Sequence, residues 1–307
     1  MLSLVVPVYF EEECIIEFVK QTTCVMDSNN IDYEIIFIDD GSVDRTVELI
    51  KNNAEENQRI KLIEFSYNHG KQSAVTAGVN HAIGDYILYM DPDLQDPPEM
   101  IPVFLNKIIE EDLDIIFGIR SEKNDTWLNK KFSALFWKVL QSLTKLNLPA
   151  NLAVMRIFSR RFADEFSKFS EQNRFIEGIF MKIGLNMSTL IIENKERFAG
   201  KTKFNFKKKV ELALNAIYDF SDIPLKLAVR IGLFFVITGF ISILVVLTLK
   251  ILYVNFQAGW PSLLAITTLY FGILILLVGI VAIYLGRVYK EVKGRPLYSI
   301  KRKTNLE

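Results

Sequence analysis

The chain has 307 residues, 50% of them hydrophobic, and its 36 basic and 36 acidic residues cancel to a formal net charge of zero. This balance argues against a nucleic-acid-binding protein, which needs a strongly basic surface. The two cysteines, Cys14 and Cys24, form no CxxC pattern, which argues against a disulfide framework or a zinc site and favours a reducing compartment.

The chain up to about residue 120 alternates strand patterns with helix patterns. Strands are expected at Leu2–Val8, Tyr33–Asp39, Lys61–Tyr67, Tyr86–Met90 and Asp114–Ile119. Helices are expected at Glu12–Met26, Asp44–Glu55, Gln72–Ala82 and Pro98–Glu111. Several strands are continuous apolar runs, as in parallel strands that helices cover on both faces. We therefore expect a doubly wound, Rossmann-like α/β sheet, which binds ligands at the carboxyl ends of its strands.

Two polar motifs follow the second and third expected strands. In "IDDGSVDRT", Asp39 and Asp40 end a strand, where an acid can accept hydrogen bonds from a nucleobase or ribose, although a plain turn with Ser42 as helix cap explains the same residues. In "NHGKQSAVTAG", Lys71 opens a helix, and a lysine beside free backbone amides suits a phosphate. His69 is a lone histidine without an assigned role. Neither a G-x-G-x-x-G nor a P-loop motif occurs, which disfavours dinucleotide binding and a P-loop NTPase.

The stretch "YILYMDPDLQDPPE" ends a strand in a cluster of carboxylates. Asp91 and Asp93 are two residues apart, so an extended backbone points both to one side, and Gln95 adds another oxygen. Such oxygens suit Mg²⁺ or Mn²⁺ held together with substrate phosphates, and the cation would relieve the repulsion between the acids. The alternative is a solvated acidic loop. Asp96 is interpreted as a turn residue before the next helix.

The remainder is more helical up to residue 193, with short strands expected near Val154–Phe158 and Thr189–Ile192. A helix over Lys207–Leu227, which begins with three lysines, is expected to lie on a membrane surface. Two uncharged runs follow, Ile231–Leu249 and Ile251–Gly286. About 20 apolar residues in a helix cross a bilayer, which predicts two membrane spans, although two buried helices of a soluble protein would give the same pattern.

The spans are placed at about 229–253 and 262–285. Basic residues flank the pair on both sides, and the positive-inside rule then places both termini in the cytoplasm, at the cytoplasmic membrane. The expected divisions are residues 1–205 for the α/β domain, 206–227 for the surface helix, 228–286 for the spans and 287–307 for a basic cytoplasmic tail.

Four motifs in order, "LVVPVYFEEE", "IDDGSVDRT", "NHGKQSAVTAG" and "DPDLQDPPE", resemble those of the inverting family 2 glycosyltransferases of GT-A fold. The element "ERFAGKTKFNF", then "FSDIPLKLAVRIG" and the two apolar runs narrow the match. Together they resemble the polyprenyl-phosphate glycosyltransferases, the group of bactoprenol glucosyltransferases and dolichol-phosphate mannose synthases. The resemblance covers nearly the whole chain.

This resemblance implies a role for each matching residue. The nucleotide-sugar would be held by Pro7, Tyr9, Glu11, Asp39, Asp40, Lys71 and Asp91. The cation and the donor diphosphate would be bound by Asp91, Asp93 and Gln95. The catalytic set would be Asp93, Arg120, Arg156, Arg197 and Lys203, whose basic members would face the acceptor phosphate, with Lys130 and Ser133 as weaker candidates.

Two positions depart from the family pattern. The first motif usually has Asn where this chain has Phe10, and many relatives carry an acid where this chain has Val154, two residues before Arg156. A sugar hydroxyl acceptor needs a base to take its proton. A lipid monophosphate, with a second pKa of about 6, is already an anionic nucleophile near neutral pH. The missing acid is therefore compatible with a phosphate acceptor.

The expected reaction moves one sugar from a nucleotide-sugar, such as UDP-glucose or UDP-GlcNAc, to a polyprenyl phosphate such as undecaprenyl phosphate, for cell-envelope glycosylation. The expected partners are these substrates and membrane lipids but no nucleic acid, and a homo-oligomer is left open.

A processive polysaccharide synthase is an alternative, but its Q-x-x-R-W element is matched only by "EQNRF". An inactive nucleotide-binding membrane scaffold is a second alternative. Phe10 and Val154 favour it, and it is opposed by the intact Asp91, Asp93, Arg197 and Lys203.

Overall fold

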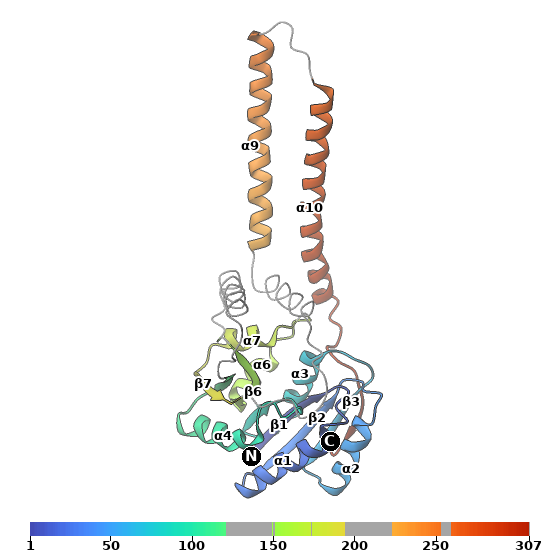
Figure 1. The fold of residues 1–307 in the computed structure, drawn as a ribbon, viewed down its shortest axis with the longest axis vertical. Coiled ribbons are helices and arrows are strands. Elements are labelled where there is room, and N and C mark those ends of the chain that lie inside the picture. The colour runs from blue at the N-terminus through green and yellow to red at the C-terminus, as the bar shows by residue number, and fades with distance from the viewer. Residues whose placement is uncertain (121–148, 150, 173, 194–222, 253–258, 307) are drawn as a thin grey trace.

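The computed structural model describes the chain except for residues 121–148, 150, 173, 194–222, 253–258 and 307. Figure 1 shows an α/β domain that contains both ends of the chain, and two long helices that run away from it side by side. Most of the expected surface helix, Lys207–Leu227, lies outside the described residues, as do Lys130, Ser133, Arg197 and Lys203.

Within the described residues, one mixed sheet of eight strands forms the centre of the domain, in the order β7-β5-β6-β4-β1-β2-β3-β8. The strands are β1 (Leu2–Val8), β2 (Tyr33–Asp39), β3 (Ile60–Phe65), β4 (Tyr86–Tyr89), β5 (Ile115–Arg120), β6 (Leu152–Ser159), β7 (Met187–Ile192) and β8 (Ile300–Thr304). Parallel pairing joins β4, β1, β2 and β3, as the apolar runs predict. The expectation of a parallel doubly wound sheet is incomplete, because β6 lies antiparallel between β4 and β5.

Helices cover both faces of the sheet, which explains why its strands are apolar throughout. They are α1 (Ile15–Ser28), α2 (Thr46–Glu56), α3 (Lys71–His81), the 3-10 turn η1 (Pro98–Met100), α4 (Ile101–Glu110), α6 (Arg160–Ser167) and α7 (Ile176–Ile183). Alternate strand residues point to opposite faces. Leu4 and Val6 of β1 therefore join the core under α1, α2 and α4, whereas Val5 joins the core under α3, α6 and α7.

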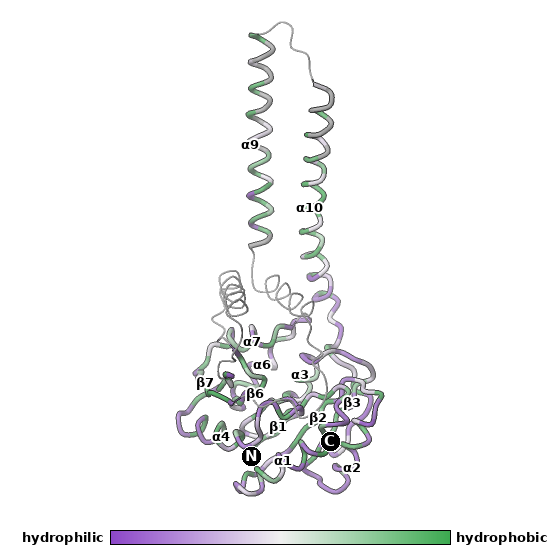
Figure 2. Tube along the Cα trace, viewed as in Figure 1, coloured by the Kyte–Doolittle hydropathy of each residue, from purple (hydrophilic) through white to green (hydrophobic). Residues whose placement is uncertain are grey.

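The two projecting helices are α9 (Ile223–Leu252) and α10 (Trp260–Val292). Figure 2 shows that both are largely apolar away from the domain. In the part of the chain that the structure describes, Leu269–Val292 is the helical segment long and apolar enough to cross a membrane by length and composition, and none of it is buried within the protein. Residues 223–227, expected as the end of a surface helix, form the start of α9 instead.

The C-terminal segment departs from the expected basic tail. Ile300–Thr304 forms β8, which pairs antiparallel with β3, with Ile300 opposite Phe65 and Thr304 opposite Leu62. The segment "IKRKT" gives a weak strand signal because three of its five residues are basic and exposed. The pairing supplies partners to the edge of β3, which would otherwise expose unpaired backbone groups.

Candidate functional site

Asp40 connects two of the polar motifs at the carboxyl ends of β2 and β3. Its buried carboxylate accepts hydrogen bonds from the backbone N–H of His69 at 2.6 Å and of Gly70 at 2.9 Å. Gly70 has φ +90°, a conformation that side-chain-bearing residues rarely adopt, and it directly precedes α3. Burial raises the pKa of Asp40, and the two backbone hydrogen bonds oppose that shift. Asp40 therefore fixes the backbone that leads to Lys71.

Asp39 organises its own turn. Its carboxylate accepts hydrogen bonds from the backbone N–H of Gly41 and of Ser42, each at 3.1 Å. Burial raises its pKa against the effect of these hydrogen bonds. Ser42 does not cap α2, which was the alternative role for this residue, since its hydroxyl accepts the backbone N–H of Phe10 at 3.0 Å. The loops after β1 and β2 are thereby tied together.

The segment after β1 carries the predicted nucleotide contacts Pro7, Tyr9 and Glu11. Pro7 lies in β1 opposite Ile38, and the backbone N–H of Glu11 donates to Thr46 Oγ1 at 2.9 Å. All three residues therefore lie at the same sheet edge as Asp39 and Asp40. Phe10 between them has φ +54°, the left-handed region that Asn tolerates far better than Phe. The Asn that usually follows the Tyr of this motif has a physical explanation in that backbone angle.

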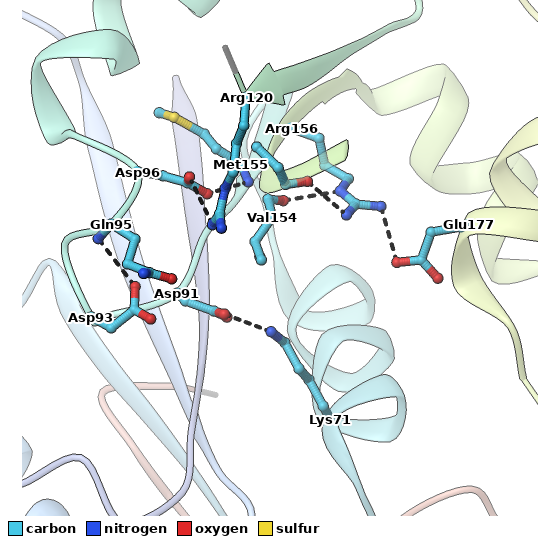
Figure 3. A network of polar contacts seen from close by, with 11 residues as sticks. Lys71, Asp91, Asp93, Gln95, Asp96, Arg120, Val154, Met155, Arg156 and Glu177 are labelled. Atoms are coloured by element: carbon cyan, nitrogen blue, oxygen red, sulfur yellow. Dashed lines mark hydrogen bonds and ion pairs between the residues drawn. The ribbon is translucent and has the colours of Figure 1, made fainter. Parts of the chain in front are cut away.

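Lys71 contacts the loop that follows β4, residues 91–96, here called the carboxylate loop, as Figure 3 shows. Its Nζ lies 2.7 Å from Asp91 Oδ2 and 5.7 Å from the centre of the Tyr89 ring. Desolvation would lower the pKa of Lys71, but the Asp91 carboxylate and the Tyr89 hydroxyl outweigh it and raise that pKa. Burial raises the pKa of Tyr89 to about 12. The predicted phosphate and metal residues are therefore adjacent, and a lysine cation compensates the charge of Asp91.

Asp93 lies in the same loop and is buried. Its Oδ1 accepts the backbone N–H of Gln95 at 3.2 Å, and Leu94 between them has φ +57°. The described residues contain no group of three or more acidic, His or Cys side chains that would form a metal cage. Two carboxylates and an amide instead fit a Mg²⁺-type cation that shares its coordination with substrate phosphates.

Asp96 is more than the turn residue expected from the sequence. It is 3% exposed, accepts the backbone N–H of Met155 at 2.8 Å and lies 3.3 Å from Arg120 Nη2. It thus joins the carboxylate loop to β5 and β6. Arg120, predicted to face the acceptor, is held at this edge by Asp96, and among the described residues its buried Nε has no hydrogen-bond partner. The interpretation of Asp96 as a turn residue alone is wrong, because β6 enters the sheet beside the loop.

Arg156 is 3% exposed and surrounded by aromatic rings. Its guanidinium carbon lies 5.3 Å from the centre of the Tyr89 ring, 5.9 Å from that of Phe117 and 5.6 Å from that of Phe180. It donates to the carbonyl of Val154 at 3.0 Å, and its Nη1 lies 3.5 Å from Glu177 Oε1 on α7. Sequence reasoning missed Glu177, because pairing between β6 and α7 leaves no local signal.

The geometry therefore gathers Asp39, Asp40, Lys71, Asp91, Asp93, Gln95, Arg120 and Arg156 at or near the carboxyl ends of neighbouring strands. Together with Pro7, Tyr9 and Glu11 at the end of β1, these are the predicted site residues that the structure describes. His69, left without a role by the sequence, lies on the loop that Asp40 holds. Its only sequence signal was its position directly before Gly70 and Lys71.

Comparison with known proteins gives an independent line of evidence. The sequence profile of the family described as "Glycosyl transferase family 2" matches residues 3–166. An uncharacterized glycosyltransferase, YkcC, of Bacillus subtilis is 37% identical over 306 residues, covering 99% of this chain and 94% of its own. A prophage bactoprenol glucosyl transferase homolog of Escherichia coli is 35% identical over 302 residues, and a bactoprenol glucosyl transferase of Shigella phage SfV is 34% identical over 301 residues. Each of these two alignments covers 98% of both chains.

A solved structure shares the fold of the α/β domain. The glucosyl-3-phosphoglycerate synthase from Mycobacterium tuberculosis, crystallised with Mn²⁺, UDP and glucosyl-3-phosphoglycerate, superposes with a TM-score of 0.52 at 16% identity. The match covers 71% of this chain and 77% of the other. The mixed sheet with strand-end loops is thus a GT-A-like α/β fold.

Proposed function

Because the chain belongs to glycosyl transferase family 2 and is a glycosyltransferase, we propose that it transfers a single sugar from a nucleotide-sugar to a polyprenyl phosphate. The observation that carries the proposal is the extent of its similarity to bactoprenol glucosyl transferases, which spans 98% of the chain. That similarity includes α9 and α10, which a soluble glycosyltransferase does not need. The product would be a polyprenyl-phosphate sugar for cell-envelope glycosylation.

The donor would bind where the first four motifs meet. Asp39, Asp40 and the segment Pro7–Glu11 would hold the nucleoside, and Lys71 would contact the diphosphate through its cationic amine. Asp91, Asp93 and Gln95 would hold Mg²⁺ or Mn²⁺ jointly with that diphosphate, and the cation would neutralise the charge of the leaving group. The pairing of Lys71 with Asp91 supports this arrangement, because it puts positive and negative groups within reach of one ligand. A uridine diphosphate sugar, UDP-glucose or UDP-GlcNAc, is the proposed donor.

The acceptor phosphate would approach Arg120 and Arg156. Arg120 has a buried Nε that lacks a hydrogen-bond partner among the described residues, which supports a role in binding an anion. Arg197 and Lys203 would add positive charge. A phosphate monoester with a second pKa of about 6 is a nucleophile without help from a base, so Val154 in place of an acid is compatible with turnover. Attack opposite the diphosphate would invert the anomeric centre.

The lipid acceptor requires access from a membrane. We propose that α9 and α10 both span it, that residues 206–222 lie on its cytoplasmic surface, and that the catalytic domain and both termini are cytoplasmic. Supporting this, Lys226 and Arg230 lie at the domain-proximal end of α9, and Arg287 and Lys290 at that of α10. Basic residues at the cytoplasmic ends of spans follow the positive-inside rule and favour anionic lipids.

The test is a donor panel with purified full-length protein in lipid nanodiscs. Undecaprenyl phosphate, Mg²⁺ or Mn²⁺ and radiolabelled UDP-sugars are supplied, and the expected product is a lipid-linked monosaccharide from one donor. Nucleotide binding without transfer from any donor would favour an inactive scaffold instead. A water-soluble polymer would favour a processive synthase.

A further inference from the structure

The segment that follows α10 returns to the catalytic domain along a defined path. Residues 293–299, here called the strap, connect the end of α10 to β8. Two hydrogen bonds from Gln172 fix the beginning of this path, one from its backbone N–H to Glu291 Oε1 at 2.8 Å and one from its Nε2 to the carbonyl of Arg295 at 2.5 Å. The strap is therefore attached to the domain before β8 begins.

The far end of the strap packs against the loop that follows β3. The Tyr298 ring stacks on Phe65 with 5.2 Å between centres and 10° between planes, and its hydroxyl accepts from Asn80 Nδ2 at 3.4 Å. The carbonyl of Ser299 accepts the backbone N–H of Ser66 at 3.0 Å. The backbone N–H of Ser299 donates to His69 Nε2 at 3.2 Å, which requires the His69 tautomer with an unprotonated Nε2.

His69 is thereby held from several sides. Its backbone N–H donates to Asp40, and its Nε2 accepts from the strap. The centre of its ring lies 4.0 Å from the centre of the Tyr67 ring and 5.4 Å from that of the Phe65 ring. Two residues later Lys71 reaches Asp91 at 2.7 Å. A continuous set of contacts therefore leads from the strap through His69 to the lysine at the proposed diphosphate site.

We propose that the strap is a working part of the donor site, in which Tyr298 and Ser299 are positioning residues that hold the His69–Gly70 loop and thereby set the affinity for a nucleoside diphosphate. This inference rests on the proposed function for the identity of the ligand. The segment after α10 would have two simpler roles, to set the membrane topology by its positive charge and to pair with the edge of β3. Neither of these roles requires contacts with the donor site. Under this proposal the donor site also depends on how α10 ends.

Three variants of the full-length protein distinguish a role of the strap in positioning the His69–Gly70 loop from an effect on the stability of the whole protein. His69→Phe keeps the ring contacts with Tyr67 and Phe65 but removes the Nε2 acceptor. Tyr298→Ala removes the stacking on Phe65. Lys301→Ala alters an exposed side chain of β8 and serves as the matched control. Titration calorimetry with UDP and Mn²⁺, thermal unfolding and the KM values for UDP-sugar and undecaprenyl phosphate are measured for each.

We expect His69→Phe and Tyr298→Ala to weaken UDP binding about 3- to 10-fold, the size of one hydrogen bond or ring contact. The KM for the lipid phosphate should stay close to wild type in both variants. The melting temperature should stay close to wild type in His69→Phe and fall in Tyr298→Ala, which loses a ring packed against the core, and Lys301→Ala should change none of these values. Equal UDP affinity in all variants, or a parallel rise of both KM values with a lower melting temperature, would overturn the proposal.

Amide hydrogen exchange separates this inference from the proposed function. In Tyr298→Ala the amides of His69 and Gly70 should exchange faster than in wild type, whereas the amides of β1 should not change. Failure of wild type to bind UDP would refute the proposed donor, while faster exchange at His69 would still show that the strap holds the loop. Unchanged exchange there would overturn the inference whatever the protein binds.

Discussion

Glu177 on α7 lies 3.5 Å from Arg156 on β6, so the carboxylate that faces this buried guanidinium comes from a different element of the fold. Val154 and Arg156 are two residues apart on β6 and therefore lie on the same face of the sheet. An acid at position 154 would have been able to pair with Arg156 directly. Glu177 thus supplies from α7 a negative charge that the strand itself lacks.

Glu177→Gln should destabilise the protein because it removes the carboxylate that faces a buried arginine. A fully buried pair costs about 3–5 kcal/mol when one partner is lost, and the 29% exposure of the Glu177 side chain reduces our expectation to about 1–2 kcal/mol. Thermal unfolding in nanodiscs measures the change. Glu165→Gln is the matched control, since it breaks an exposed pair with Lys168 that is worth about 0.5 kcal/mol or less.

A charge relocation tests whether position 154 and Glu177 are interchangeable. In the Glu177→Gln background, Val154→Asp returns a carboxylate to the same face as Arg156, and we expect it to recover a large part of the lost stability. In wild type the same substitution crowds two acids around one arginine and should destabilise. If Val154→Asp has the same effect in both backgrounds, the two acids do not share Arg156 as a partner.

Phe10→Asn should stabilise the protein. Phe10 has φ +54°, and an ordinary side chain in the left-handed region costs about 1–2 kcal/mol, of which Asn relieves a part. The loss of the ring contact with Tyr9, at 4.3 Å, acts in the opposite direction. Phe10→Ala loses that contact as well but keeps the strain, so Asn should be the more stable of the two variants by thermal unfolding. Equal stability would show that the backbone angle is not strained.

How far the sequence predicts this protein depends on whether an interaction is local. The strands from Leu2 to Tyr89 and the motifs that follow them could be located because periodicity and strand-end polarity are local signals. The insertion of β6 between β4 and β5 could not be predicted, because antiparallel pairing between strands that are far apart in the sequence has no local signal. Asp96 was misread for that reason, since its partners Arg120 and Met155 come from β5 and β6.

The same limit applies to the C-terminal segment. Its lysines and arginines predict a solvated tail, and only the three-dimensional structure brings Ile300 opposite Phe65. Sequence resemblance identified Asp91, Asp93 and Lys71 as neighbours in function, which the ion pair between Lys71 and Asp91 supports at 2.7 Å. It could not distinguish the acids by role, because that depends on which partner each carboxylate faces.

Asp93→Asn and Asp96→Asn should therefore fail in different ways. Asp93→Asn removes a proposed cation ligand and should reduce transfer more than 100-fold, with weaker Mn²⁺ binding in the presence of UDP and a melting temperature near wild type. Asp96→Asn leaves Arg120 without its carboxylate and should lower stability by about 2–3 kcal/mol. Calorimetry with Mn²⁺ and thermal unfolding distinguish the two. Full activity of Asp93→Asn would remove the basis for the metal assignment.

The pKa of Asp40 predicts a pH dependence whose sign can be worked out. Burial raises this pKa above its ordinary value of 3.8, so between that value and the raised pKa the folded protein binds more protons than the unfolded chain. The stability contribution of Asp40 must then fall as pH rises through this window and stay constant above it. At neutral pH the charged carboxylate therefore costs stability, which its hydrogen bonds to His69 and Gly70 partly offset.

Asp40→Asn isolates this contribution, because other titrating groups cancel when the variant is subtracted from wild type. We expect the stability of wild type relative to Asp40→Asn to be highest near pH 4 and to decline toward neutral pH, as measured by thermal unfolding across that range. A difference that rises with pH would mean that the hydrogen bonds from the His69–Gly70 loop outweigh desolvation and lower the pKa instead. Such a result would make the loop a stronger anion-binding element than its burial suggests, because the same two amides would favour a negative charge.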